Sequence, residues 1–235
     1  MTGNSLIEIL ISLLLASLLL TTEIQLYSIC QQHYLKAQKT FERGLERQRV
    51  IALMRDSIRR AGFTPCLNLD NLQTLDHRSS MPIEAMVVTD KTLKISRMSE
   101  EFFLAKRLNS KQVLLPKRKI WPRQVPLLIA DCYHAEVNTV NSIAASNEGL
   151  ILNLSYPLFA DNEDVLYLGE WIEERFFIAK NKKERDVLYY QTRHKEQLSQ
   201  EIEALSLTSA QPLIRVVLQE TNHTNIIVET RQRSL

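Results

Sequence analysis

Residues Leu6–Leu20 read LIEILISLLLASLLL, and this stretch decides the fold of the N-terminal part of the chain. It contains one charged residue, Glu8, among apolar residues and two serines. A helix that crosses a bilayer needs about 20 apolar residues. The run approaches that length by continuing past Thr21 and Thr22 toward Ile29. The segment therefore predicts an apolar helix of membrane-spanning length near the N-terminus.

Two ordinary explanations of this segment leave features unexplained. A secretory signal peptide has a basic start, a short apolar core and a cleavage site of small residues after the core. Here no Lys or Arg precedes the core, and the chain continues as TTEIQLYSI after it. A simple membrane anchor does not explain Glu8, because a carboxylate inside an apolar helix costs roughly 3 kcal/mol and by default marks a functional position. Glu8 is therefore either a chance acidic residue near the interface or a residue with a role.

The residues around Glu8 resemble a known family. The stretch GNSLIE, residues 3–8, followed by the apolar run, is similar to the leader of type IV pilins and type II secretion pseudopilins. The resemblance implies a leader peptide of residues 1–3, cleaved between Gly3 and Asn4 by a prepilin peptidase that methylates the new N-terminus. It also implies that Glu8, fifth in the mature chain, pairs with the free amine of a neighbouring pilin during assembly. A buried carboxylate is tolerable when a cation meets it.

Two features depart from the usual pattern of that family. Asn4 stands where the family usually has Phe, and residues 1–3 contain no basic residue. The nearest positive charges, Lys36, Lys39 and Arg43, follow the apolar run. The positive-inside rule alone would place the C-terminal domain in the cytoplasm. We follow the resemblance instead, which implies an inner-membrane protein with a single span and its C-terminal domain in the periplasm.

We expect the first helix to extend over residues 4–62. No proline occurs between Met1 and Pro65, and the segment is rich in Leu, Gln, Glu, Lys and Arg, which favour helix. Gly62 and Pro65 form a stop signal, since Gly caps helix ends and Pro does not continue them. Apolar residues at roughly helical spacing predict one packed face, made of Tyr27, Tyr34, Phe41, Leu45, Ala52 and Ile58.

Residues 63–235 have a different pattern, in which short β-branched and aromatic segments alternate with polar turns. The spacing indicates hairpins, so we expect an α+β fold in which one antiparallel β-sheet head packs on the second half of the helix. The resemblance implies that this fold is pilin-like. Glu201–Leu207 fits a short helix or a further strand. The expected strands are Ala85–Val88, Thr92–Ser96, Val125–Ile129, Glu136–Val140, Leu150–Leu154, Val165–Tyr167, Trp171–Ile178, Val187–Gln191, Leu213–Leu218 and Ile226–Glu229.

Three cysteines, Cys30, Cys66 and Cys132, refine the resemblance. The segments RRAGFTPC, residues 59–66, and LIADCYHA, residues 128–135, resemble two cysteine-containing segments of minor pilins of the PilW kind. In a periplasmic domain, Cys66 and Cys132 could form a disulfide, which would contribute roughly 4 kcal/mol by restricting the unfolded chain. Cys30 lies in the helix and is expected to be a free thiol.

The resemblance implies a minor pilin, related in fold to the pseudopilin GspJ, that helps to prime pilus assembly within a tip complex. Its expected partners are other minor pilins, the major pilin, the prepilin peptidase and the inner-membrane assembly platform, and the pilus tip is a second location. Two alternatives stay open. One is a minor pseudopilin of a type II secretion system, and the other is a membrane-anchored periplasmic binding protein or enzyme.

We expect no catalytic site, cofactor or metal centre. The net charge of +2 gives no strong field toward nucleic acid. Cys132 and His134 suggest a nucleophile pair, but a structural cysteine is favoured. Residues 161–164, DNED, lack the spacing of a calcium loop, and a solvated turn is favoured. Residues 117–123, KRKIWPR, could contact DNA or lipid head groups, but an exposed loop is favoured.

Overall fold

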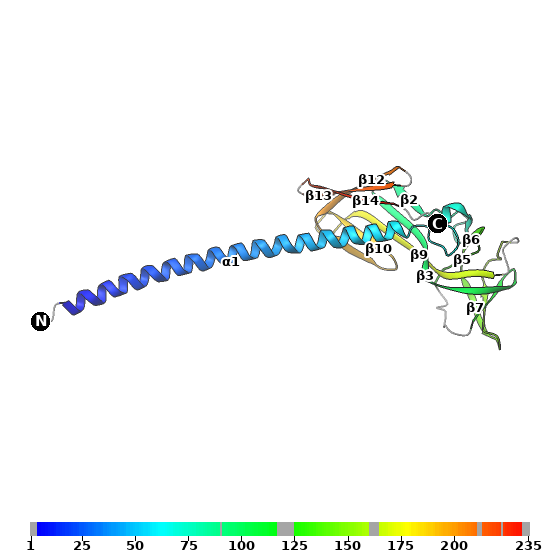
Figure 1. Ribbon diagram of the computed structural model, residues 1–235, viewed down its shortest axis with the longest axis horizontal. Helices are drawn as coiled ribbons and strands as arrows, with labels where there is room; N and C mark the ends of the chain where they lie inside the picture. Colours follow the sequence, from blue (N-terminus) through cyan, green and yellow to red (C-terminus); the bar gives the residue numbers. More distant parts are fainter. Residues whose placement is uncertain are drawn as a thin grey trace. The chain divides into compact units, whose positions relative to one another are not determined.

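The computed structural model of the chain describes residues 4–89, 91–116, 125–159, 165–210, 213–221 and 223–231. The fold is α+β, with a long N-terminal helix and two β-sheets (Figure 1). The chain divides into two compact units, Met1–Arg49 and Val50–Leu235. Helix α1 (Asn4–Arg59) runs through both of them.

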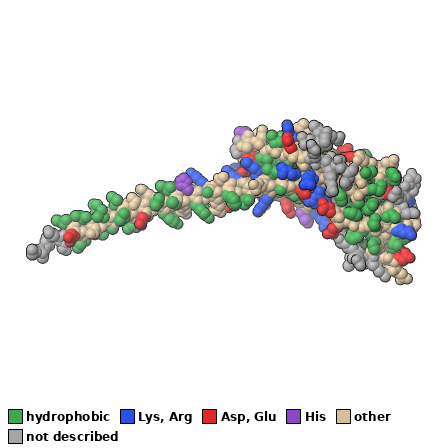
Figure 2. All heavy atoms as spheres, viewed as in Figure 1, with side chains coloured by type: hydrophobic (Ala, Val, Ile, Leu, Met, Phe, Trp, Pro, Cys, Tyr) green, Lys and Arg blue, Asp and Glu red, His purple; other side chains and the backbone are tan. Residues whose placement is uncertain are grey.

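The first unit is helical and largely apolar on its surface. Each large apolar side chain from Ile7 to Ile29 is more than half exposed, and Figure 2 shows hydrophobic side chains over much of this part of the helix. Ser17, Thr21 and Thr22 each donate a hydrogen bond of 2.8 Å to the carbonyl three residues earlier. These hydroxyls are thus satisfied within the helix, which suits an apolar environment.

The second unit begins with the last ten residues of α1, which pack into a core. Val50, Met54 and Ile58 recur at helical spacing and are fully buried. They contact buried residues from both sheets, among them Phe176 and Val216. This end of the helix is therefore the central element of the main hydrophobic core.

The helix ends because Gly62 reverses the chain. α1 ends at Arg59, and Gly62 has a φ of 71°, a conformation that favours glycine. Its N–H donates to the carbonyl of Ser96 at 2.9 Å, and its own carbonyl accepts from Leu69 at 2.9 Å. A Cβ at Gly62 would lie 2.2 Å from Oδ1 of Asn68, so no other residue fits here without displacement. A short 3-10 helix, η1 (Leu69–Asn71), follows.

Among the described residues, eleven strands form one mixed sheet. Its main path is β1-β6-β5-β9-β3-β4-β8-β7, and β2 pairs with β3, β10 with β9, and β11 with β10. The pairs are antiparallel except β1 with β6. The strands are β1 (Gln73–Asp76), β2 (Met86–Thr89), β3 (Thr92–Asn109), β4 (Gln112–Leu115), β5 (Leu127–Ala130), β6 (His134–Asn138), β7 (Val140–Ala145), β8 (Leu150–Leu154), β9 (Val165–Lys180), β10 (Asp186–Gln191) and β11 (Lys195–Ser199).

A second, antiparallel sheet closes the core on the side of the C-terminus. It consists of β12 (Ile202–Ala210), β13 (Leu213–Glu220) and β14 (Asn225–Arg231). Alternate residues such as Val216, Leu218 and Val228 are buried and join the core that contains the end of α1. Figure 1 shows the last turns of α1 beside β9 and β10, with β12, β13 and β14 close by.

The structure corrects several sequence predictions. The prediction of a single antiparallel sheet was wrong, because the described strands form two sheets and include one parallel pair. The predicted strands 165–167 and 171–178 are one strand, β9. Of the two alternatives for residues 201–207, the strand is confirmed, because β12 begins at Ile202. The predicted packed face of the helix was also wrong in part. Tyr27, Tyr34, Phe41, Leu45 and Ala52 are exposed, and of the six residues named only Ile58 is buried.

Candidate functional site

The first candidate site is the apolar surface of α1 around Glu8. Glu8 is exposed and lies beside its neighbour Ile9 and beside Ser12, Leu13 and Ala16, which are one to two turns further on. Within the described part of the chain, Glu8 has no cationic partner. When another molecule buries this apolar surface, the carboxylate is buried with it. A buried carboxylate is costly unless a cation pairs with it, so the other molecule has to bring that cation.

The predicted leader cleavage site is only partly within the described residues. Gly3 lies outside them, and Asn4 is the first residue of α1. Among the described residues, α1 is the one helix that is both long enough and apolar enough to cross a membrane. Its most apolar window has a mean hydropathy of 2.0. Length and composition therefore fit a single-pass anchor.

A disulfide joins Cys66 and Cys132, whose Cα atoms lie 5.2 Å apart. Cys66 follows the turn that ends α1, and Cys132 lies between β5 and β6, so the bond ties the helix end to the edge region of the larger sheet. Cys30 is a free, exposed thiol. The bond leaves Cys132 without a thiol, so a nucleophilic Cys132–His134 pair does not exist in this oxidised state.

The residues around Cys132 form a tight turn. The Oδ1 of Asp131 accepts hydrogen bonds from the backbone N–H groups of Tyr133 at 2.7 Å and His134 at 2.6 Å. Its other oxygen lies 3.2 Å from Nδ1 of His134. Ala135, the last residue of the same sequence segment, is fully buried. Asp131 and Ala135 thus position Cys132, and the segment has a structural role.

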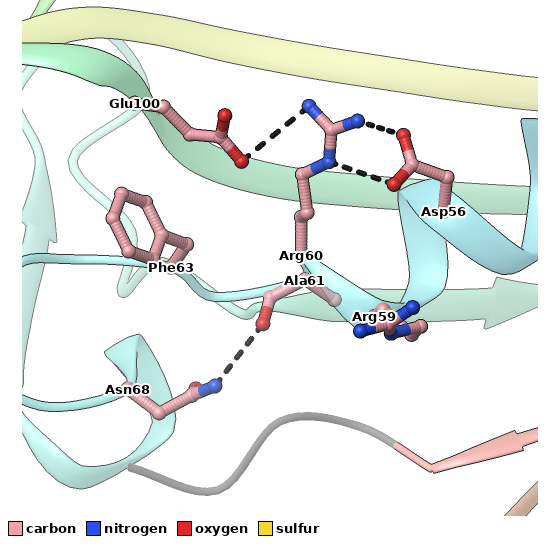
Figure 3. Close-up of a pocket in the computed structure, with 7 residues that line it drawn as sticks. All are labelled: Asp56, Arg59, Arg60, Ala61, Phe63, Asn68 and Glu100. Atoms are coloured by element: carbon pink, nitrogen blue, oxygen red, sulfur yellow. Dashed lines mark hydrogen bonds and ion pairs between the residues drawn. The ribbon is translucent and has the colours of Figure 1, made fainter.

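The other cysteine-containing segment lines a small pocket of about 140 Å³ at the end of α1 (Figure 3). Arg60 lies between two carboxylates: it forms hydrogen bonds and an ion pair with Asp56, and its guanidinium is 3.5 Å from Glu100. On the opposite wall, Asn68 donates to the carbonyl of Ala61 at 3.0 Å. Because these polar groups are engaged with one another, the pocket stabilises the helix end rather than presenting a reactive group.

A buried ionic cluster lies where α1 meets the larger sheet. Glu174 of β9 is 3% exposed and accepts hydrogen bonds from Arg97 of β3 at 2.8 and 3.0 Å. Its second oxygen accepts from the hydroxyl of Ser57 on α1. Burial, and next the negative charge of Glu174, raise the pKa of Tyr190 to about 12. The cluster borders a groove of about 490 Å³ that Trp171 also lines.

Two histidines contact buried carboxylates in the same unit. His77 lies 2.7 Å from Glu136, which is fully buried, and stacks on Tyr156 with 5.1 Å between ring centroids. His134 pairs with Asp131 as described above. In the part of the chain that the structure describes, no group of three or more His, Cys, Asp or Glu residues could hold a metal ion.

Sequence reasoning missed these buried charges because charged residues usually indicate exposed positions. The alternation of β9 is the one signal that could have found Glu174, since it shares a face with Phe176 and Ile178. Residues 117–123, considered for DNA and lipid contacts, and residues 161–164, considered for calcium, lie outside the described ranges.

Comparison with known proteins identifies no relative: no protein-family model, curated protein or solved structure matches this chain.

Proposed function

We propose that the chain is a type IV pilus minor pilin of the PilW kind, which helps to prime pilus assembly as part of a tip complex. The observation that carries the proposal is Glu8. This carboxylate stands five residues after Gly3, on an exposed apolar helix surface, and has no cationic partner among the described residues. A neighbouring subunit that buries this surface must bring a cation, and a free N-terminal amine on an adjacent apolar helix supplies one.

The two cysteine segments support the same assignment. Gly62 ends the helix, Cys66 and Cys132 are joined, and Asp131 shapes the turn that holds Cys132. The residues that resemble the PilW kind of minor pilin are thus those with structural roles in this chain. If the two cysteine segments resembled those minor pilins only by chance, we would not expect them to coincide with the end of a helix and with a disulfide.

In this proposal the chain is an inner-membrane protein with one span and a periplasmic C-terminal unit. Its partners are other minor pilins, the major pilin, the prepilin peptidase and the assembly platform. It acts as a structural subunit without enzymatic activity. The sheet, with eleven strands among the described residues, is larger than that of a typical pilin head.

A second candidate function is a membrane-anchored periplasmic binding protein. The groove of about 490 Å³ beside Arg97, Trp171 and Tyr190 favours it, because ligand sites are commonly concave and lined by aromatic residues with a few polar groups. In that case α1 would serve only as an anchor. Full function after replacement of residues 4–29 by an unrelated membrane span would support this candidate and contradict the minor pilin.

Deletion of the gene tests the proposed function against its alternatives. A minor pilin that primes assembly should give a strain with few or no surface pili while the major pilin accumulates in the inner membrane. Type II secretion should continue normally, and the full chain supplied in trans should restore the pili. Loss of secretion with normal piliation would identify a pseudopilin instead, and loss of neither would favour the binding protein.

A further inference from the structure

β9 lacks a strand partner along a short part of one edge. On that edge, its residues 167–170 pair with β5 and its residues 175–180 pair with β10. The opposite edge stays paired with β3 through residues 171–177. Because β5 and β10 both run antiparallel to β9, they lie in line and leave an interval between them. Among the described strands, none pairs with residues 172–174 on this edge.

The backbone groups that face this interval follow from one hydrogen bond. The N–H of Trp171 donates to the carbonyl of Pro126 at 3.0 Å, so the N–H and C=O of Trp171 point to this edge. Alternate residues of a strand point their backbone groups to the same edge, so Glu173 also faces the interval, whereas Ile172 faces β3. Pro126 has no N–H to offer to the carbonyl of Trp171. The interval therefore presents one backbone donor and two backbone acceptors that no described strand pairs.

The unpaired part of the edge lies in the groove of about 490 Å³. Both flanking strands contribute to its lining, with Val125 and Pro126 before β5 and Thr192 and Arg193 after β10. Residues 170–174 of β9 line it as well. Sites for small ligands typically have volumes of roughly 300–1,000 Å³. The backbone groups are thus placed where a short ligand can enter.

The charges of the groove are already paired within the chain. Each carboxylate that β9 contributes to the lining has an Arg or Lys partner within 2.8 Å. A ligand with a net charge would have to compete with these pairs, so a neutral ligand that offers hydrogen bonds is favoured. The pairs are Arg97 with Glu174, Arg193 with Glu170, and Lys94 with Glu173.

Trp171 adds a side-chain donor at the same place. Its side chain is 5% exposed and lines the groove. In the part of the chain that the structure describes, its Nε1 has no hydrogen-bond partner. A buried donor without an acceptor is unfavourable, so a ligand carbonyl that reaches Nε1 would stabilise the complex.

We propose that this interval of β9 is a binding site for a short, neutral, extended peptide of another protein, which adds to the sheet between β10 and β5. A peptide backbone is uncharged and supplies donors and acceptors in alternation, as the groove requires. The peptide residue opposite Glu173 exchanges two hydrogen bonds with it. The positions opposite residues 172–174 are open, so the inserted segment is about three residues, or roughly 10 Å, long.

Hydrogen exchange of single backbone amides tests the site in the full chain in detergent. In the free chain, the amide of Glu173 should exchange at least about tenfold faster than that of Ile172, which faces β3. The probe is the blocked tripeptide acetyl-Val-Thr-Val-amide, followed by NMR. At about ten times its Kd, it should slow the exchange of Glu173 about tenfold and leave Ile172 unchanged.

Two controls identify the backbone and the groove as the determinants. The same tripeptide with an N-methyl group on its Thr lacks the central N–H, and it should give no protection to the wild-type chain. Thr192→Trp fills the end of the groove and should abolish protection by the unmodified tripeptide. Thr221→Trp is the matched variant at another exposed position, away from the groove, and it should behave as wild type.

Four results would overturn the proposal. Slow exchange of Glu173 in the free chain would show that the interval is already filled, and no response up to the solubility limit of the tripeptide would exclude a peptide site. Equal protection by the N-methylated tripeptide would exclude backbone recognition, and unchanged protection in Thr192→Trp would place the peptide elsewhere. None of these measurements involves Glu8 or piliation, so the proposal can fail or hold independently of the proposed function.

Discussion

Ser57 on α1 donates a hydrogen bond to Glu174 on β9, 117 residues later in the chain. Glu174 also accepts two hydrogen bonds from Arg97 on β3, so one buried carboxylate joins the helix end to the two longest strands of the sheet. Because a buried carboxylate needs these partners, the contact fixes the rotation of the last turns of α1 about the helix axis. The helix end is therefore held by charge pairing as well as by apolar packing.

Replacement of Arg97 by Ala should destabilise the second unit strongly. The change leaves the carboxylate of Glu174 buried without its cation, and breaking a buried pair in this way costs about 3–5 kcal/mol. Urea unfolding of the full chain in detergent, followed by circular dichroism, measures the loss. Arg215→Ala is the matched control, because its pair with Glu229 is exposed and should contribute less than about 1 kcal/mol. Equal losses in the two variants would contradict the role of the cluster.

Gly62→Ala should also destabilise the fold. The residue has a φ of 71°, and its new Cβ would lie 2.7 Å from Cβ of Ala85, which cannot rotate away. The expected loss is about 2–4 kcal/mol, from backbone strain and a steric clash together. Gly44→Ala is the control, since no atom lies within 4 Å of its Cβ position and Ala favours helix. A Gly62→Ala chain as stable as wild type would show that the turn is not required.

Removal of the disulfide should cost about 2–5 kcal/mol, because the unfolded chain gains conformational freedom. The double substitution Cys66→Ala and Cys132→Ala tests this by thermal unfolding. Cys30→Ser should leave the stability unchanged, because that thiol is free and exposed. Intact mass measured without reductant on protein from the native compartment gives the direct check. Free thiols at both Cys66 and Cys132 would contradict the bond.

Alkaline pH should weaken the fold through Tyr190. Burial and the charge of Glu174 raise its pKa to about 12, whereas an unfolded tyrosine titrates near 10. The folded chain holds the phenolic proton more tightly, so this contribution is complete below pH about 10 and is lost as the pH rises toward about 12. Denaturant unfolding across this range should show a falling stability that is less steep in Tyr190→Phe. Identical slopes for both chains would refute the link.

The sequence was informative where local chemistry determines structure. The helix was predicted from the apolar run, from the absence of proline and from Gly62 as the capping residue at its end. Its predicted end lies within three residues of the observed end at Arg59. The strand Leu150–Leu154 was predicted with its observed bounds, because polar turns flank a short apolar run. The pair Cys66–Cys132 followed from the periplasmic location that the resemblance implies, together with the position of Cys30 in the helix.

Sequence reasoning failed where tertiary pairing determines structure. β3 continues past the polar residues Ser99–Glu101 because it pairs with β9 up to Met98 and again from Phe102. The three polar residues form a bulge without register partners in β9, and local propensity does not reveal this. The buried face of α1 was misjudged for the same reason. Tyr27 and Val50 fit a packed helix face equally well by period, and only the position of the sheets decides that Val50 is covered.

The surface density of pili in a Glu8→Ala strain tests the central claim most directly. Electron microscopy of that strain is compared with wild type and with Ser12→Ala, whose side chain lies one turn away on the same helix surface. We expect the Glu8→Ala chain to be cleaved after Gly3 and inserted in the membrane, as intact mass would show, but to support few or no pili. Ser12→Ala should support normal numbers. Normal piliation with Glu8→Ala would contradict an assembly role for this carboxylate, and with it the assignment of the chain as a minor pilin.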